Sequence, residues 1–217
     1  MIDDLFAPPP GSDDCTERLT PGTVLLHGMA LPLAAQLLAD ITAIAAAAPF
    51  RHMITPGGYR MGVATTSCGE LGWMSDQHGY RYSRIDPGSG QPWPAMPASW
   101  RTLAGDAAAR AGFAGFVADA CLINRYEPGC KLSLHQDKDE RDFAAPIVSV
   151  SLGLPAVFQL GGLRRSARCA TLQLRHGDIL VWGGPDRLRY HGVLPLAGGE
   201  HPLLGACRIN LTFRRAG

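Results

Sequence analysis

The chain has 217 residues, of which 46% are hydrophobic and 18% are charged. This length suits one domain or two small ones, and the composition excludes a largely disordered chain because it supplies enough apolar surface for a core. The formal net charge of +1 excludes a histone-like polybasic protein. It still permits local binding of nucleic acid through a basic patch.

The chain carries no sign of export or of membrane insertion. Its first residues lack the basic and then apolar pattern of a secretory signal. The most apolar window, 31–50, is interrupted by Gln36, Asp40 and Thr42, which argues against a membrane span. The six cysteines form no CxxC pair, so we expect neither a zinc cluster nor a disulfide framework. The cysteine pattern therefore predicts a cytoplasmic protein with reduced thiols.

The first half of the chain is expected to contain one helix and little else that is regular. Residues 1–20 include PPP and GSDD and are expected to form a flexible arm. Alternation over 22–28 predicts a short strand. The Ala-rich segment 31–48 predicts a helix that ends before Pro49, because its apolar residues recur at helical spacing. Turn formers dominate 50–97, which predicts a long segment with little regular structure.

The second half has the pattern of a β protein. Ser99 is placed to cap a helix over 99–112. Beyond residue 118, short apolar segments alternate with Gly and Pro, a spacing typical of a sandwich or barrel. The expected strands are 120–127, 145–153, 156–162, 170–177, 178–184 and 206–214. We therefore predict one domain over 21–217, mainly β, with two helices packed outside the β core.

The segment LHQDKD carries the first chemical signal. His135 and Asp137 are two residues apart, so both leave the same face of an extended chain. His191, in RYHGV, is the best candidate for a third ligand. Two histidines and one carboxylate with open positions form the facial triad of non-haem Fe(II) oxygenases. Taken alone, an HxD pair is weak evidence, and polar residues at the end of a strand explain it equally simply.

The segment RINLTFR carries the second signal. Arg208, Asn210 and Arg214 share one face of a strand, and each arginine is a fork suited to a carboxylate. Because the two arginines are six residues apart, we expect one to hold the far carboxylate of a dicarboxylic acid and the other its metal-side end. The alternative is a pair of exposed arginines on an edge strand. Asn124 and Tyr126 also share a face and can orient a small organic acid.

Together these segments resemble the AlkB family of DNA-repair dioxygenases. The resemblance rests on DACLINRY, PGCKLSLHQDKDE, HGDILVWGG, RYHGV and CRINLTFR, and it extends back to PFRHMITPGGYRMGVATTSCGELGW. It implies an α+β fold with a double-stranded β-helix, or jelly-roll, core and an N-terminal helical extension. It also implies that 50–97 is a nucleotide-recognition lid. Fe(II), 2-oxoglutarate and O2 are the implied cofactors and cosubstrates.

The resemblance also assigns residues motif by motif. The implied iron ligands are His135, Asp137 and His191. The implied 2-oxoglutarate contacts are Asn124, Tyr126, Arg208, Asn210 and Arg214. Of the two arginines, Arg208 is expected near the metal-side carboxylate and Arg214 at the distal one. The implied substrate-binding residues are Trp73, Tyr80, Arg81, Tyr82, Asp139 and Arg165.

The implied activity is oxidative demethylation of 1-methyladenine and 3-methylcytosine in single- or double-stranded DNA, and in RNA, with release of formaldehyde, succinate and CO2. A monomer is expected. The base must leave the helix, so Trp73 is expected to stack on it and Asp139 to face its positive charge. Two alternatives stay open. An oxygenase of proteins or small molecules would not need Trp73, Asp139 or Arg165, and a non-catalytic reader of methylated nucleic acid would not need the complete triad.

Overall fold

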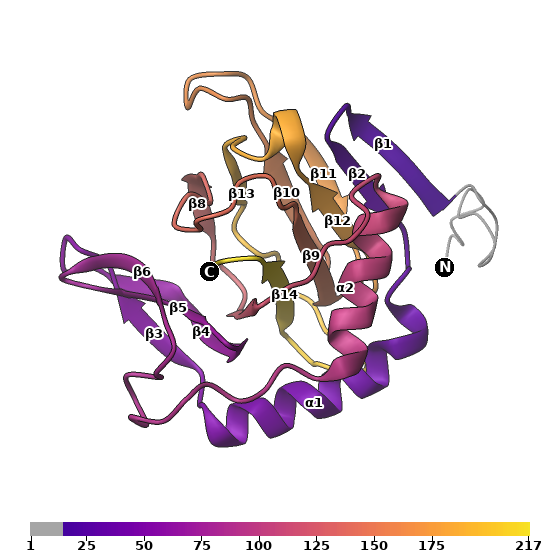
Figure 1. The fold of residues 1–217 in the computed structure, drawn as a ribbon. Coiled ribbons are helices and arrows are strands. Elements are labelled where there is room, and N and C mark those ends of the chain that lie inside the picture. The colour runs from indigo at the N-terminus through magenta and orange to yellow at the C-terminus, as the bar shows by residue number, and fades with distance from the viewer. Residues whose placement is uncertain (1–14) are drawn as a thin grey trace.

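The computed structural model describes residues 15–217, which form two antiparallel sheets, a separate hairpin and two outer helices (Figure 1). From edge to edge, the large sheet contains β1 (Thr16–Thr20), β2 (Thr23–Leu26), β12 (Ile179–Trp182), β9 (Ile147–Gly153), β14 (Arg208–Arg214), β7 (Ala120–Tyr126), β4 (Arg60–Gly69) and β3 (Arg51–Ile54). The small sheet contains β11 (Ala170–Leu174), β10 (Ala156–Leu160), β13 (His191–Val193) and β8 (Leu132–His135). The hairpin consists of β5 (Gly72–Asp76) and β6 (Gly79–Ser83).

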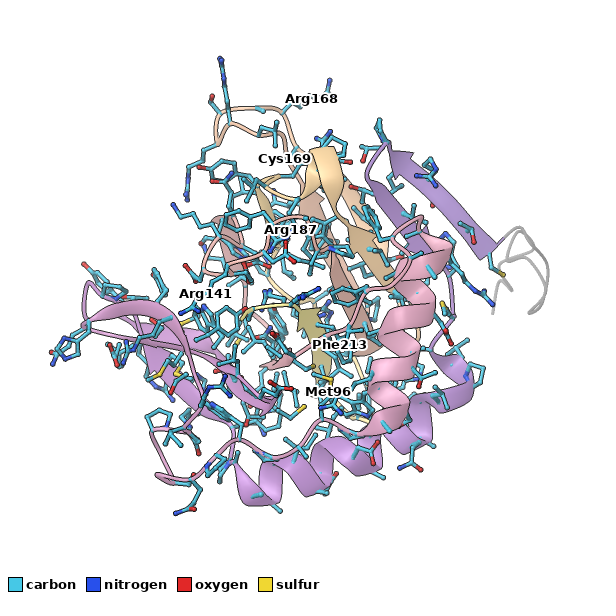
Figure 2. All side chains as sticks on the ribbon, in the orientation of Figure 1. Met96, Arg141, Arg168, Cys169, Arg187 and Phe213 are labelled. Atoms are coloured by element: carbon cyan, nitrogen blue, oxygen red, sulfur yellow. The ribbon has the colours of Figure 1, made fainter. Side chains whose placement is uncertain are left out.

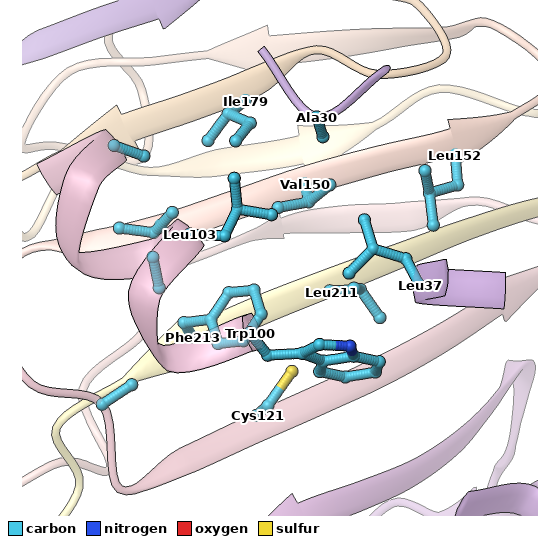
Figure 3. Packing of buried hydrophobic residues seen from close by; sticks show 14 of the residues in the cluster. Ala30, Leu37, Trp100, Leu103, Cys121, Val150, Leu152, Ile179, Leu211 and Phe213 are labelled. Carbon is cyan, nitrogen blue, oxygen red and sulfur yellow. The ribbon is translucent and has the colours of Figure 1, made fainter. Parts of the chain in front are cut away.

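The two helices cover one face of the large sheet (Figure 1). They are α1 (Ala34–Ala47), which follows the 3-10 turn η2 (Leu31–Leu33), and α2 (Ala98–Arg110). Trp100 of α2 is fully buried, and its ring meets Phe213 of β14 edge-on, with 6.0 Å between ring centroids (Figure 3). Its indole N–H donates to Asp40 Oδ2 of α1 at 2.9 Å. Trp100 therefore ties both helices to the centre of the sheet.

A second core lies between the two sheets. Leu180 and Trp182 from the large sheet pack with Phe158 and Val193 from the small sheet. The rings of Phe158 and Trp182 are 6.1 Å apart. The expected β core with two outer helices is thus confirmed, as are the helix that ends before Pro49 and the strands beyond residue 118.

The segment 50–97 differs from its prediction, because it contains the four strands β3 to β6. Strand β4 is buried along most of its length and pairs with β7. Its sequence, RMGVATTSCG, has small and polar residues where large apolar ones would normally reveal a strand. Gly79 has a φ of +117°, so the turn formers here reverse the chain between strands.

Two boundaries are corrected as well. Thr16–Thr20 pairs with β2, so the expected arm does not extend to residue 20, and residues 1–14 lie outside the described part. Helix α2 begins at Ala98 with Pro97 as its N-cap, and no side chain caps it. Ser99 lies two residues too late for that role.

Two absences agree with the sequence for the described residues. None of their helices has the length and apolar character needed to cross a membrane. All six cysteines, which lie within 15–207, are free thiols.

We expect Trp100→Ala to lower the free energy of unfolding by about 3–5 kcal/mol, because it leaves a cavity between both helices and β14. Trp100→Phe should cost less, since it loses mainly the hydrogen bond to Asp40. Urea denaturation followed by circular dichroism measures both. A loss below about 1 kcal/mol for the alanine variant would contradict this account of the core.

Candidate active site

The structure brings His135, Asp137 and His191 together. His135 ends β8, His191 begins β13, and the two residues are direct partners across the small sheet. The potential ligand atoms of the three side chains lie within 4.8 Å of one another. Gly192 makes this approach possible, because a Cβ there would lie 2.7 Å from the Leu132 carbonyl oxygen.

Both imidazoles are oriented by the backbone. The Nδ1 atom of His135 lies 2.9 Å from the Ser133 carbonyl, and that of His191 lies 3.0 Å from the Arg189 carbonyl. Each Nδ1 therefore donates, and each Nε2 presents its lone pair to the centre. The pKa of His191 falls to about 4, because burial and then the neighbouring His135 disfavour its charged form. A neutral imidazole is the form that binds metals.

Asp137 is the anionic member of the group. Burial alone would raise its pKa, but the charge of Arg214 together with the contacts of His135 and His191 outweighs burial and holds the pKa of Asp137 well below its usual range. Its Oδ1 lies 3.4 Å from His135 Nε2, and its Oδ2 lies 3.7 Å from His191 Nε2. Two imidazole nitrogens and one ionised carboxylate are the donor set of a non-haem Fe(II) site, so these residues fit that metal.

The two arginines of β14 have different surroundings. Arg214 donates to Asp137 Oδ2 from Nη2 at 2.6 Å and from Nε at 3.1 Å. Arg208 is 1% exposed, lies over the Tyr126 ring at 4.9 Å and donates from Nη2 to Ser151 Oγ at 3.0 Å. Its Nε and Nη1 have no partner among the described residues. Buried guanidinium donors left unpaired in this way fit a carboxylate ligand.

These contacts place the two arginines differently relative to the triad, and which carboxylate each of them binds stays a prediction. Arg214, assigned from the sequence to the distal carboxylate, lies at the metal end, whereas Arg208 lies six residues away along β14. The alternation of a strand shows which residues share a face. It does not show which end of the strand points to the metal.

One cavity of about 540 Å³ joins these groups to residues of the segment 50–97. The predicted site residues that line it are His135, Asp137, His191, Asn124, Tyr126, Arg208, Asn210, Arg214, Trp73, Tyr80, Asp139 and Arg165. Trp73 and Tyr80 stack with centroids 5.7 Å apart, and the Trp73 indole donates to Asp139 Oδ2 at 2.8 Å. The Arg165 guanidinium lies 5.8 Å from the Tyr190 ring centroid.

Comparisons with known proteins agree with this geometry. Residues 22–214 match the 2OG-Fe(II) oxygenase superfamily. The chain is 57% identical to the alpha-ketoglutarate-dependent dioxygenase AlkB of Escherichia coli K12, over 99% of this chain and 98% of the relative. The chain belongs to the AlkB family. It is also 36% identical to the mouse nucleic acid dioxygenase ALKBH1, over 52% of this chain and 30% of that protein.

The solved structure of OsALKBH1 has the same fold as this AlkB-family chain. The TM-score is 0.80 at 27% identity, and the match covers 92% of this chain and 99% of that one. The jelly-roll fold expected from the sequence is thereby confirmed. As a family member, the chain is an Fe(II)- and 2-oxoglutarate-dependent dioxygenase that uses O2.

Two predicted substrate contacts of the AlkB-family chain do not line the cavity. Arg81 pairs with Asp76 inside the hairpin, with Nη2 2.6 Å from Oδ2. Tyr82 donates its hydroxyl to Glu140 Oε1 at 2.8 Å, and burial raises its pKa well above the usual range, so it stays a protonated donor. Tyr82 thus makes an internal contact. Binding of substrate by Tyr82 and Arg81 stays a prediction.

Two buried charges of this AlkB-family site were missed from the sequence. Glu140 Oε2 accepts from Arg187 Nη2 at 3.0 Å, and Glu140 Oε1 lies 3.2 Å from Arg214 Nε. Both residues of the Glu140–Arg187 pair are close in sequence to proposed iron ligands. That proximity was the available signal, because their mutual contact spans 47 residues.

We expect alanine substitution of His135, Asp137 or His191 to weaken Co(II) binding at least tenfold, because each removes one donor. Isothermal titration with Co(II) measures the affinity directly. His176→Ala is the control, because His176 does not line the cavity. A triad variant that binds Co(II) like the unmodified protein would remove that residue from the ligand set.

Proposed function

We propose that this chain is an oxidative demethylase that repairs N-alkylated bases, 1-methyladenine and 3-methylcytosine, in DNA and also in RNA. The products are the unmodified base, formaldehyde, succinate and CO2. The supporting observation is that one cavity contains both halves of such a site. Inside it lie the three residues that can bind a metal and the unpaired donors of Arg208. Its wall also contains the stacked rings of Trp73 and Tyr80, next to the carboxylate of Asp139. The mouse relative's name, nucleic acid dioxygenase, supports the same substrate class.

His135, Asp137 and His191 would hold the iron. When bound, iron supplies the oxidation by O2 that hydroxylates the N-methyl carbon at the expense of 2-oxoglutarate. The protein's own part is placement and charge. Arg214 keeps Asp137 ionised and fixes Oδ2 through two donors, while the two imidazoles are held by backbone carbonyls. The donor atoms are therefore oriented before any ligand enters.

Arg208 would bind the distal carboxylate of 2-oxoglutarate. Its Nε and Nη1 are buried and unpaired, and the ring of Tyr126 fixes the plane of the guanidinium. Asn124 and Asn210 are partners across β7 and β14 and line the same cavity. Asn210 Nδ2 donates to Ser149 Oγ at 2.8 Å, so its position is held within the sheet.

An unstacked base would enter past Trp73 and Tyr80. A nucleotide must leave its helix to reach a buried site, and aromatic rings provide surfaces on which it can stack. The preferred lesions are cationic, which suits the π faces and the carboxylate of Asp139. Arg165 is exposed at the wall of the cavity and would contact a phosphate. An oxygenase of proteins or small molecules would need none of these groups.

We further propose that the enzyme acts as a monomer in the cytoplasm, on single- or double-stranded substrates. Its six free cysteines fit a reducing compartment. Gel filtration with light scattering measures the mass of the particle in solution.

We expect Arg208→Met to raise the KM for 2-oxoglutarate at least tenfold, because the distal carboxylate loses a charged, bidentate partner. Arg208→Lys should recover part of the loss, since it restores a charge without the fork. Succinate release at varied 2-oxoglutarate concentrations gives the KM. An unchanged KM in the folded Met variant would place the distal carboxylate elsewhere.

We expect Asp139→Ala to slow repair of 1-methyladenine and 3-methylcytosine more than repair of the neutral 1-methylguanine and 3-methylthymine, because the cationic lesions alone draw on its charge. The measurement is the initial rate on four oligonucleotides that differ in one base. Asp142→Ala, which removes a partly exposed carboxylate of the same loop, is the matched control. Equal losses on all four lesions would remove the electrostatic role of Asp139.

We expect Trp73→Ala to slow repair of all four lesions, because it removes a stacking surface worth about 1–3 kcal/mol per base. The KM for 2-oxoglutarate should not change, since Trp73 lies in the lid segment and not beside Arg208. Full repair activity in both the Trp73 and the Asp139 variants would revive the protein or small-molecule alternative.

A further inference from the structure

Asp137 differs from the two histidines in how the fold supports it. His135 and His191 lie on paired strands of the small sheet. Asp137 lies on the loop 136–146, which connects β8 to β9 without regular secondary structure. A loop of this kind lacks ladder hydrogen bonds, so another group must hold the carboxylate within the tolerance of a metal site.

One buried guanidinium holds this loop. Arg187 is 2% exposed and lies in the interior (Figure 2). Its Nη1 donates to the Asp137 carbonyl at 2.8 Å, its Nη2 to Glu140 Oε2 at 3.0 Å and its Nε to the Ala145 carbonyl at 3.1 Å. Its carbon Cζ lies 5.4 Å from the Phe143 ring centroid. Arg187 thus contacts the beginning, the middle and the end of the loop.

The segment that carries Arg187 is itself anchored to the large sheet. Arg187 follows the 3-10 turn η3 (Gly184–Asp186) and precedes His191 by four residues. Asp186 Oδ2 accepts from the Gly22 amide at 2.8 Å and from Thr23 Oγ1 at 3.0 Å. Because this segment is fixed to the large sheet, the guanidinium of Arg187 holds the loop of Asp137 in a fixed position as well.

Stability alone is a weak explanation for such a group. A buried ion pair such as Glu140 with Arg187 loses much hydration, and an apolar pair of similar size is often as stable. Recognition of two carbonyls and a carboxylate by one planar fork is specific to arginine, because lysine has a single ammonium. These contacts therefore fix the position of the loop more than they stabilise the fold.

We propose that Arg187 is a positioning residue of the iron site, which fixes the main chain at Asp137 while Arg214 fixes the side chain. The inference rests on the proposed function, in which His135, Asp137 and His191 hold the iron. Asp137 is then held at both its carbonyl and its Oδ2 by two different arginines.

The test measures Co(II) binding and the visible absorption of the Co(II) protein, which reports ligand geometry independently of turnover. Arg187→Met should weaken Co(II) binding by about 10–100-fold, the usual effect of removing a group that orients a metal ligand. Its absorption spectrum should differ from that of the unmodified protein. Arg187→Lys should fall between the two, because it retains the charge facing Glu140.

The control is Arg215→Met. Arg215 contacts the same loop from the surface, with Nε 3.7 Å from Asp142 Oδ2 and 55% of its side chain exposed. Surface pairs of this kind contribute little, so affinity and spectrum should be those of the unmodified protein. An equal effect of both methionine substitutions would overturn the proposal, because it would show a general sensitivity of the loop.

A folding defect is separated by a double variant. Arg187→Met leaves Glu140 buried without that partner, so Glu140→Gln is combined with it to remove the charge, and thermal unfolding confirms a folded chain. A folded double variant with full Co(II) affinity and an unchanged spectrum overturns the proposal, and weakened binding supports it. His135→Ala serves as the reference. If His135→Ala binds Co(II) normally, the proposed ligand set is wrong. If His135→Ala loses Co(II) affinity and Arg187→Met does not, the ligand set stands and only the positioning role of Arg187 is wrong.

Discussion

The contact between Arg214 and Asp137 determines which end of the cavity lies at the triad. It holds a buried carboxylate ionised and places one end of β14 against the triad. Because β14 is a central strand between β7 and β9, its other end carries Arg208 away from that centre. In the proposed function, one strand thus defines a metal end and a cosubstrate end. A dicarboxylic acid that lies along it would meet a fixed charge at each end.

The same strand serves two environments through simple alternation. Leu211 and Phe213 pack under the helices, whereas Arg208, Asn210 and Arg214 line the cavity. The cavity face is polar and buried, which is costly unless its groups are paired. Side chains of the neighbouring β9 supply partners to Arg208 and Asn210. Packing on one face therefore fixes the positions of polar groups on the other.

The features that could be predicted from the sequence are those that depend on local spacing. Alternation in RINLTFR identified the shared face of its polar residues, and helical spacing identified α1. Long-range facts were out of reach. The direction of β14 relative to the triad depends on how the sheets pack, and the Glu140–Arg187 contact joins segments 47 residues apart. Strand β4 could not be predicted because its small and polar residues show no apolar pattern. It is a strand because neighbouring strands pair with it and bury it.

The hydrogen bond from the Trp73 indole to Asp139 has a consequence for what the carboxylate can still bind. The indole N–H occupies only Oδ2, and an ionised carboxylate has acceptor sites on both oxygens. Oδ1 can therefore accept from another donor while the indole keeps its place. In the proposed function, the exocyclic amine of adenine or cytosine would be that donor. The indole would then orient the carboxylate for its ligand, and no hydrogen bond within the protein would have to break when the base enters.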